Sequence, residues 1–187
     1  MILIKKTTSI SGFYELEPHI ASDDRGTFIK IFHQGIFKDL DLNTDWPEEY
    51  YSISRRGVLR GMHFQVPPFD HAKVVFCTSG QILDVALDLR QFSPTYGKYA
   101  SFILSSESLN MAYLTPGLAH GFYVLSQSAT VFYKVSTTHY PKADSGIRWD
   151  SFGFHWPSAS PVLSDRDQRL EQLSDFKSPF LNKLEKW

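Results

Sequence analysis

Apolar and polar residues alternate in short runs along most of the chain, and this pattern predicts strands. Residues 27–32, Thr-Phe-Ile-Lys-Ile-Phe, alternate in the manner of a half-buried strand. Residues 1–16 contain one or two short strand patterns, interrupted at Ser11-Gly12. Further strand patterns follow at 50–54, 57–65, 73–78, 81–89, 99–104, 112–117, 120–125 and 130–136.

Turns and short helical segments separate these strands. The Ser79-Gly80 pair predicts a hairpin between 73–78 and 81–89. A second tight turn is predicted at 55–57. Residues 34–40 predict one short helix, and Ser164 is typical of an N-cap for another. About ten short strands with little helix predict an all-β fold, either a double-sheet jelly roll or a barrel.

The composition indicates an ordinary single domain over residues 1–187. Hydrophobic residues make up 42% of the chain and charged residues 21%. The formal net charge of −1 favours neither nucleic acid nor a membrane as partner. Cys77 is the only cysteine, so a reducing compartment is expected. With no apolar run of membrane-spanning length and no secretory pattern at the start, a cytoplasmic protein is expected.

The stretch from Gly57 to Lys73 carries polar groups where an apolar strand would be simpler. His63 and Gln65 share a face of a regular strand, and Arg60 points to the other face unless a bulge at Gly61 re-aims it. Lys73 lies beside His63 if the two strands pair. A base, a cation and an arginine around one cavity suit an anionic substrate that must lose a proton. The simpler alternative is a hydrogen-bonded core histidine.

Several short stretches, in order from residue 23 to 167, carry a resemblance to a known family. They are Asp23-Asp-Arg-Gly26, residues 57–65, Asp84-Val-Ala-Leu-Asp-Leu-Arg90, Ser93-Pro-Thr-Tyr-Gly97, Pro116-Gly-Leu-Ala-His-Gly-Phe122, Tyr133-Lys134, Gly146-Ile-Arg-Trp149 and Leu163-Ser-Asp-Arg-Asp167. Together they resemble the dTDP-4-dehydrorhamnose 3,5-epimerases, nucleotide-sugar epimerases of the cupin superfamily.

The resemblance implies a fold and an activity. It implies a cupin-type double-sheet jelly roll with a few short helices. The activity is inversion of C3, C5 or both in a nucleotide-linked 4-keto-6-deoxyhexose through an enolate, with no metal and no cofactor. The expected role is deoxysugar synthesis for surface polysaccharide such as lipopolysaccharide O-antigen. It also implies a homodimer, in which residues 1–32 lie across the partner subunit.

The same resemblance assigns chemistry to individual residues. His63 matches the base, Asp167 the carboxylate that orients it, and Tyr133 the acid on the opposite face. Lys73 matches the cation that stabilises the enolate, with His120 beside it. Taken singly, each of these residues also fits a structural role.

Some residues expected to bind the substrate match the family, and others differ from it. Arg25 and Arg60 match positions near the diphosphate, where a guanidinium suits phosphate oxygens. Departures occur at the nucleotide end, where this chain has Ala21, Lys30, Glu48, Tyr50, Thr138 and His139. Lys30 only donates hydrogen bonds and therefore fits cytosine N3 and O2 better than thymine N3–H. The sequence thus favours a CDP-linked sugar, with a dTDP-linked sugar as the alternative.

Two other functions are compatible with a cupin fold. A metal-dependent cupin usually has two histidines two residues apart on one strand, whereas Gln65 follows His63 here. A non-catalytic sugar-nucleotide-binding cupin would not need His63, Lys73, Tyr133 and Asp167 together.

Overall fold

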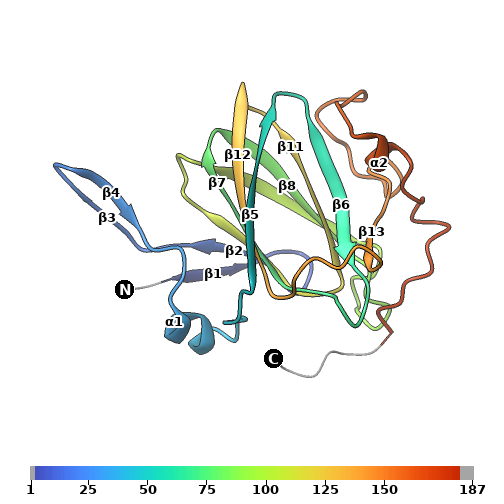
Figure 1. Cartoon of the computed structure of the whole chain (residues 1–187), viewed down its shortest axis with the longest axis horizontal. Coiled ribbons are helices and arrows are strands. Elements are labelled where there is room, and N and C mark those ends of the chain that lie inside the picture. Colours follow the sequence, from blue (N-terminus) through green and yellow to red (C-terminus); the bar gives the residue numbers. More distant parts are fainter. Residues whose placement is uncertain (1–2, 182–187) are drawn as a thin grey trace.

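Two antiparallel sheets pack face to face in the computed structural model, which describes residues 3–181 (Figure 1). The six-stranded sheet has, in order, β1 (Ile4–Thr7), β2 (Phe13–Glu17), β10 (Met111–Leu114), β7 (Lys73–Ser79), β12 (Ser128–Val135) and β5 (Glu48–Arg55). The five-stranded sheet has β13 (Asp144–Gly146), β6 (Leu59–Gln65), β11 (Leu118–Val124), β8 (Gln81–Asp88) and β9 (Tyr99–Ser105). The predicted all-β fold of two sheets is confirmed.

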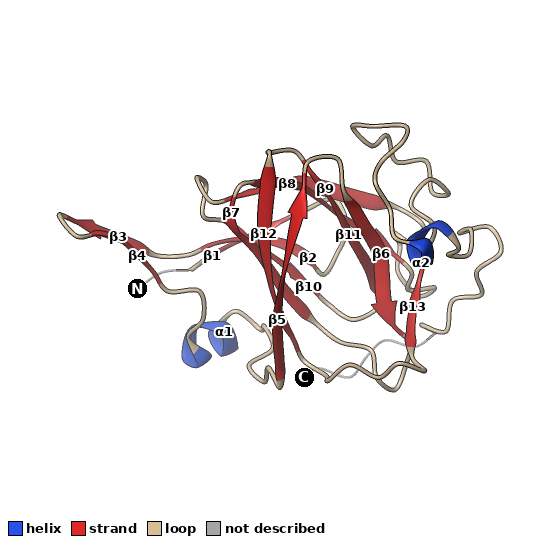
Figure 2. Cartoon of the chain, turned by 45° about the horizontal axis from the view of Figure 1, so that its top comes forward, coloured by secondary structure: helices blue, strands red, loops and turns tan. Residues whose placement is uncertain are grey.

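Short elements flank the sandwich. A separate hairpin of β3 (Ile20–Asp23) and β4 (Gly26–Ile29) precedes α1 (Gln34–Asp39). Helix α2 (Asp165–Gln168) lies beside the five-stranded sheet (Figure 2). The side chain of Ser164 caps this helix, as predicted. Both helices fall within the segments expected to be helical.

The predicted hairpin at Ser79-Gly80 is wrong. Strand β7 belongs to the six-stranded sheet and β8 to the five-stranded sheet, so the turn crosses from one layer to the other. Strands β5 and β6 are divided between the sheets in the same way. Both β7 and β8 carry long buried apolar runs. Each of the two strands gains free energy by burying its apolar run between neighbouring strands and the opposite layer, which an isolated hairpin would not provide.

The core lies between the two sheets. It includes Val75 and Val131 from one sheet and Ala86, Leu104 and Phe122 from the other, all buried. The rings of Phe13 and Phe102 stack at 4.8 Å and join the layers near one end. Loss of water from these apolar faces is the main stabilising term of the sandwich.

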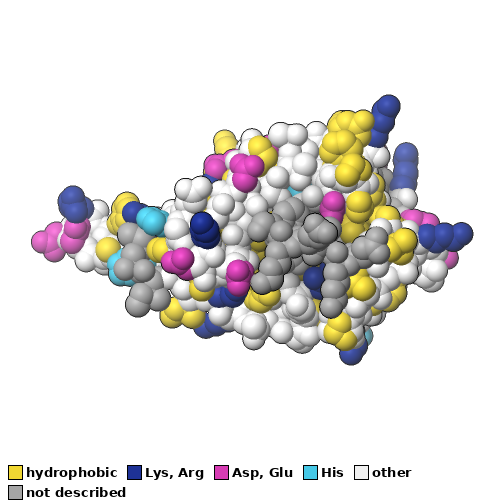
Figure 3. Space-filling model, turned by 90° about the horizontal axis from the view of Figure 1, so that it is seen from below, with side chains coloured by type: hydrophobic (Ala, Val, Ile, Leu, Met, Phe, Trp, Pro, Cys, Tyr) yellow, Lys and Arg dark blue, Asp and Glu magenta, His cyan; other side chains and the backbone are white. Residues whose placement is uncertain are grey.

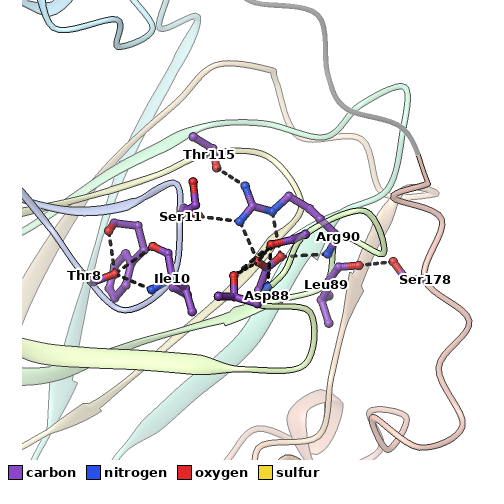
Figure 4. Close-up of polar contacts among 11 residues, drawn as sticks. Thr8, Ile10, Ser11, Asp88, Leu89, Arg90, Thr115 and Ser178 are labelled. Atoms are coloured by element: carbon purple, nitrogen blue, oxygen red, sulfur yellow. Dashed lines mark hydrogen bonds and ion pairs between the residues drawn. The ribbon is translucent and has the colours of Figure 1, made fainter.

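An ionic network closes the end of β8 (Figure 4). Arg90 donates from Nε and Nη2 to the two carboxylate oxygens of Asp88, each at 2.8 Å. Ser93 and Thr95 donate to the same carboxylate at 2.6 and 2.7 Å. Arg90 also reaches Thr115 at 3.3 Å. Two of the stretches that carried the family resemblance therefore contribute Asp88, Arg90, Ser93 and Thr95 to the fold rather than to the cavity described below.

The β3–β4 hairpin projects from the body of the molecule (Figure 1). All of residues 19–28 are exposed, including Ile20 at 42% and Phe28 at 60%. Acidic and basic side chains gather at its tip (Figure 3). Exposed apolar side chains on a projecting hairpin are typical of a surface that a second subunit covers. The dimerisation role expected for residues 1–32 stays a prediction.

Candidate active site

A cavity of about 340 Å³ opens between the two sheets at one end of the sandwich. Strands β5, β7 and β12 supply its wall from one sheet, and β6 and β11 supply it from the other. The residues that line it are Tyr50, Ser52, Arg60, His63, Phe64, Gln65, His71, Lys73, His120, Phe122, Tyr133, His139, Asp144 and Arg166. Acidic and basic side chains from the two layers thus line one cavity.

A bulge in β6 places Arg60 and His63 in the same cavity. His63 lies opposite His120 and Arg60 opposite Phe122, so β6 uses three steps where β11 uses two. Gly61 sits in this bulge with φ of 144°, and a Cβ there would lie 2.5 Å from the Cα of Gly121. Only glycine fits such a close approach in that conformation. The bulge considered from the sequence is present and re-aims Arg60.

His63 and Asp167 form a close pair. Nε2 of His63 lies 2.7 Å from Oδ1 of Asp167, whose residue is 3% exposed. Burial tends to raise the pKa of Asp167, but the hydrogen bond and charge of His63 outweigh it and hold the pKa below its usual value. The backbone N–H of Gly61 also points at this carboxylate, at 3.4 Å. An ionised Asp167 therefore orients the imidazole and stabilises its protonated form, which leaves Nδ1 to take a proton.

Lys73 reaches the cavity from the sheet opposite His63. Its Nζ donates to the backbone carbonyl of His63 at 3.1 Å, and the residue is 6% exposed. The two residues are close, as predicted, but β6 and β7 do not pair. Burial lowers the pKa of Lys73 to about 8, although the carboxylates of Asp144 and Asp84 counteract it.

A second histidine–carboxylate pair lies on the neighbouring strands β11 and β8. Nε2 of His120 is 2.7 Å from Oδ2 of Asp84, and both residues are buried. The sequence assigned His120 to the site but gave Asp84 no role. The only sequence signal is an acidic residue inside an otherwise buried apolar strand, which demands a partner.

Tyr133 faces the cavity from β12. It is 7% exposed, and burial raises its pKa well above the usual value. The ring of Tyr50 stacks on it at a centroid distance of 4.7 Å, and burial raises the pKa of Tyr50 to about 12. Both phenols are therefore protonated near neutral pH, the form that a proton donor requires.

The predicted nucleotide-end residues are only partly brought together. Glu48 accepts a hydrogen bond from the backbone N–H of His139 at 2.6 Å, and both line a second cavity of about 200 Å³ with Tyr50. Tyr50 and His139 also line the main cavity, so the two hollows adjoin.

Arg25 and Lys30 do not reach either hollow within one chain. Arg25 lies at the hairpin tip, where it pairs with Asp23. The Nζ of Lys30 lies 6.0 Å from the ring centre of Phe28. Their roles at the diphosphate and at the base stay predictions, and they would need a second subunit to carry the hairpin to a cavity.

Three further residues at the cavity had no predicted role. Asp144 and Arg166 pair at 2.8 Å on its wall, and His71 lies close to Lys73. Within residues 3–181, no group of three or more His, Cys, Asp or Glu side chains is placed to hold a metal ion. No helix in the same residues is long and apolar enough to cross a membrane.

Comparison with known proteins gives one consistent answer. The family model for dTDP-4-dehydrorhamnose 3,5-epimerase matches residues 7–175. The enzymes of that name from Shigella flexneri and Escherichia coli K12 are each 37% identical to this chain, covering 90% of it and 94% and 93% of the relatives.

Solved structures agree with the sequence relatives. A Legionella pneumophila epimerase in complex with dTDP-4-keto-L-rhamnose superposes with a TM-score of 0.91 at 31% identity, covering 98% of this chain and 100% of that one. A 3'-monoepimerase from Streptomyces bikiniensis in complex with dTDP-quinovose gives 0.85 at 32% identity, over 90% and 87% of the two chains. With sequence and structure in accord over nearly its whole length, the chain belongs to the dTDP-4-dehydrorhamnose 3,5-epimerase family of isomerases.

Proposed function

We propose that this protein inverts C3, C5 or both in a dTDP-linked 4-keto-6-deoxyhexose, using its own side chains as base, acid and electrophile. The observation that carries the proposal is that His63, held by Asp167, and Tyr133 line one cavity from opposite sheets. Epimerisation needs a base on one side of the reacting carbon and a proton donor on the other.

The reaction follows from these positions. His63 takes the proton from the carbon next to the C4 ketone, and the C–H electron pair becomes the C=C bond of an enolate. The ketone oxygen gains the negative charge, beside the Lys73 ammonium and the His120 imidazole. Tyr133 then donates its proton to the same carbon from the opposite face. Solvent restores the proton of Tyr133 and removes the one that His63 acquired.

Arg60 supports the anionic part of the substrate. Its Nε donates to Ser54 Oγ at 3.0 Å, which holds the guanidinium at the cavity wall. A guanidinium offers paired N–H donors to phosphate oxygens.

The names of the relatives favour dTDP as the nucleotide. The Legionella and Streptomyces proteins are described with dTDP-sugars. The CDP-linked alternative depends on Lys30, which lies outside the cavity of its own chain. Calorimetric titration with dTDP, CDP, UDP and GDP discriminates them, and we expect dTDP to bind most tightly. Tighter binding of CDP would instead support the reading of the base by Lys30.

Deuterium exchange tests the activity itself. The purified protein is incubated with dTDP-4-keto-6-deoxyglucose in deuterated water, and NMR locates the deuterium. We expect deuterium at C3, C5 or both, with inverted product. Binding without any exchange would favour the non-catalytic sugar-nucleotide-binding cupin.

A further inference from the structure

The phenol ring of Tyr133 has neighbours on three sides in the wall of the main cavity. On its own sheet, the two residues directly opposite it in register are Tyr50 of β5 and Val75 of β7. Such pairs on antiparallel strands have Cβ atoms about 5 Å apart and point to the same face. From the other sheet, the ring of His120 meets Tyr133 edge-on, with 6.4 Å between the ring centres and 76° between the planes. These neighbours restrict how far the ring can turn.

Two of these neighbours are fixed by their own surroundings, whereas Tyr50 lies at the edge of the sheet. Val75 belongs to the buried core, and Nε2 of His120 lies 2.7 Å from Oδ2 of Asp84. Tyr50 lies on β5, the last strand of the six-stranded sheet, and is 41% exposed. Figure 1 shows β5 beside β12. On this side, the ring of Tyr133 is therefore covered by one side chain rather than by a further strand.

The contact between the two tyrosines is an aromatic stack. Their ring centres lie 4.7 Å apart, and the ring planes differ by 20°. Aromatic pairs in such an arrangement stabilise each other beyond the area that they bury. Both residues line the main cavity, so the stack lies where the substrate would be bound. The reaction described above uses Tyr133 as the acid and gives Tyr50 no part.

We propose that Tyr50 is a positioning residue, whose ring holds the phenol of Tyr133 in the orientation from which its hydroxyl reaches the substrate. That Tyr133 donates a proton rests on the function proposed above; the restraint on its ring does not. The enolate can take a proton from either side. A proton returned by His63 restores the original configuration, and a proton from Tyr133 inverts it. The inverted fraction therefore depends on how much of the time the Tyr133 hydroxyl is in place.

NMR of the free protein tests the restraint without any turnover. The tyrosine rings are labelled with ¹³C, and the signals of Tyr133 are assigned with the Tyr133→Phe variant. In the wild-type protein and in Tyr50→Phe, we expect a high order parameter for the Tyr133 ring and a nuclear Overhauser effect to the ring of His120. In Tyr50→Leu, both should decrease. A Tyr133 ring that is equally ordered and equally close to His120 in Tyr50→Leu would overturn the proposal.

Two variants and a control test the effect on the reaction. Tyr50→Phe keeps the ring and loses the hydroxyl, whereas Tyr50→Leu keeps an apolar side chain and loses the stack. Tyr51→Leu is the matched control, because Tyr51 is the next residue of the same strand and stacks on Phe132 outside both cavities. Each variant is incubated with dTDP-4-keto-6-deoxyglucose in deuterated water. NMR measures the inverted product and the deuterium in uninverted substrate separately, and the melting temperature checks folding.

The ratio of inversion to exchange without inversion is the informative quantity. Tyr50→Leu should lower this ratio roughly two- to tenfold, the range that corresponds to the loss of one aromatic stack. Tyr50→Phe and Tyr51→Leu should keep it near the wild-type value.

Three results would refute the positioning role. They are an unchanged ratio in Tyr50→Leu, an equal loss of exchange and inversion in that variant, and a ratio that falls as far in Tyr50→Phe, which would make the hydroxyl responsible. If the wild-type protein shows no exchange at all, the proposed function fails, and the NMR of the free protein alone decides whether Tyr50 holds Tyr133.

Discussion

In the proposed mechanism, His63 and Asp167 contribute unequally to the proton abstraction. Replacing His63 by Ala removes the base and should abolish deuterium exchange next to the ketone. Replacing Asp167 by Asn keeps the shape of the pair, which spans 2.7 Å, but loses the charge that stabilises the imidazolium. Exchange should then fall by about 10²- to 10⁴-fold. Rates are measured by NMR in deuterated water, and normal exchange in the His63 variant would refute the assignment.

Variants of Tyr133 and of His63 should differ in whether they still exchange deuterium into the substrate. Tyr133→Phe removes the hydroxyl at a buried position while His63 remains able to exchange the proton on its own face. The variant should therefore exchange deuterium while forming little inverted product. Product is identified by NMR coupling constants. Parallel loss of exchange and inversion would point to another donor or to a disturbed cavity.

Lys73 should limit activity at alkaline pH. Its role requires the ammonium form, and burial lowers its pKa to about 8, so the rate should fall as pH rises through that value. The phenol of Tyr133 does not account for this decline, because its pKa is raised instead. Lys73→Arg carries a cation that keeps its proton, so any remaining activity should lose the alkaline decline. Initial rates between pH 6 and 10 provide the check, and a decline that persists in the arginine variant would exclude Lys73 as its source.

At the scale of elements, the β6 bulge controls where the site residues point. Gly61→Ala places a methyl group 2.5 Å from the backbone of Gly121, at φ of 144°. We expect a loss of on the order of 2–4 kcal/mol in the free energy of unfolding. Gly26→Ala is a matched control, since Gly26 has φ of 122° but nothing within 4 Å of an added Cβ. It should cost about 1 kcal/mol from strain alone. Urea denaturation compares the two, and equal losses would contradict the importance of the close approach.

The strands themselves were predictable, while their partners were not. Alternation and buried runs locate β6, β7, β8, β11 and β12 because each strand carries its own pattern of burial. The Ser79-Gly80 pair signals a reversal of the chain, but the same residues serve a turn within a sheet or an arch between sheets. The pattern of one strand therefore does not reveal which layer the next strand joins.

For the candidate site, the sequence likewise indicated several residues of the cavity but not all of their partners. Family resemblance supplied His63, Lys73 and Tyr133, and the structure brings them to one cavity. The pairing of Asp84 with His120 was not predictable, because it depends on how two strands are aligned.

At the scale of the whole molecule, the exposed β3–β4 hairpin predicts a dimer. Ile20 and Phe28 are 42% and 60% exposed, and a second subunit would bury them. Light scattering on the eluted peak should give about twice the chain mass of 21.4 kDa at micromolar concentration. Replacing both residues by Asp should yield a folded monomer, as judged by circular dichroism. A monomeric wild-type protein would refute this prediction and remove the route by which Arg25 and Lys30 could reach a cavity.

The division of the cavity between two sheets has a consequence for stereochemistry. Packed sheets lie roughly 10 Å apart, so a sugar ring held between them has one layer on each side. A trigonal carbon held there presents one side to the layer of His63 and the other to the layer of Tyr133. In the proposed reaction, the hand of the product would therefore follow from the two-layer architecture, and a change of rotamer within either layer would alter the rate of the reaction but not its handedness.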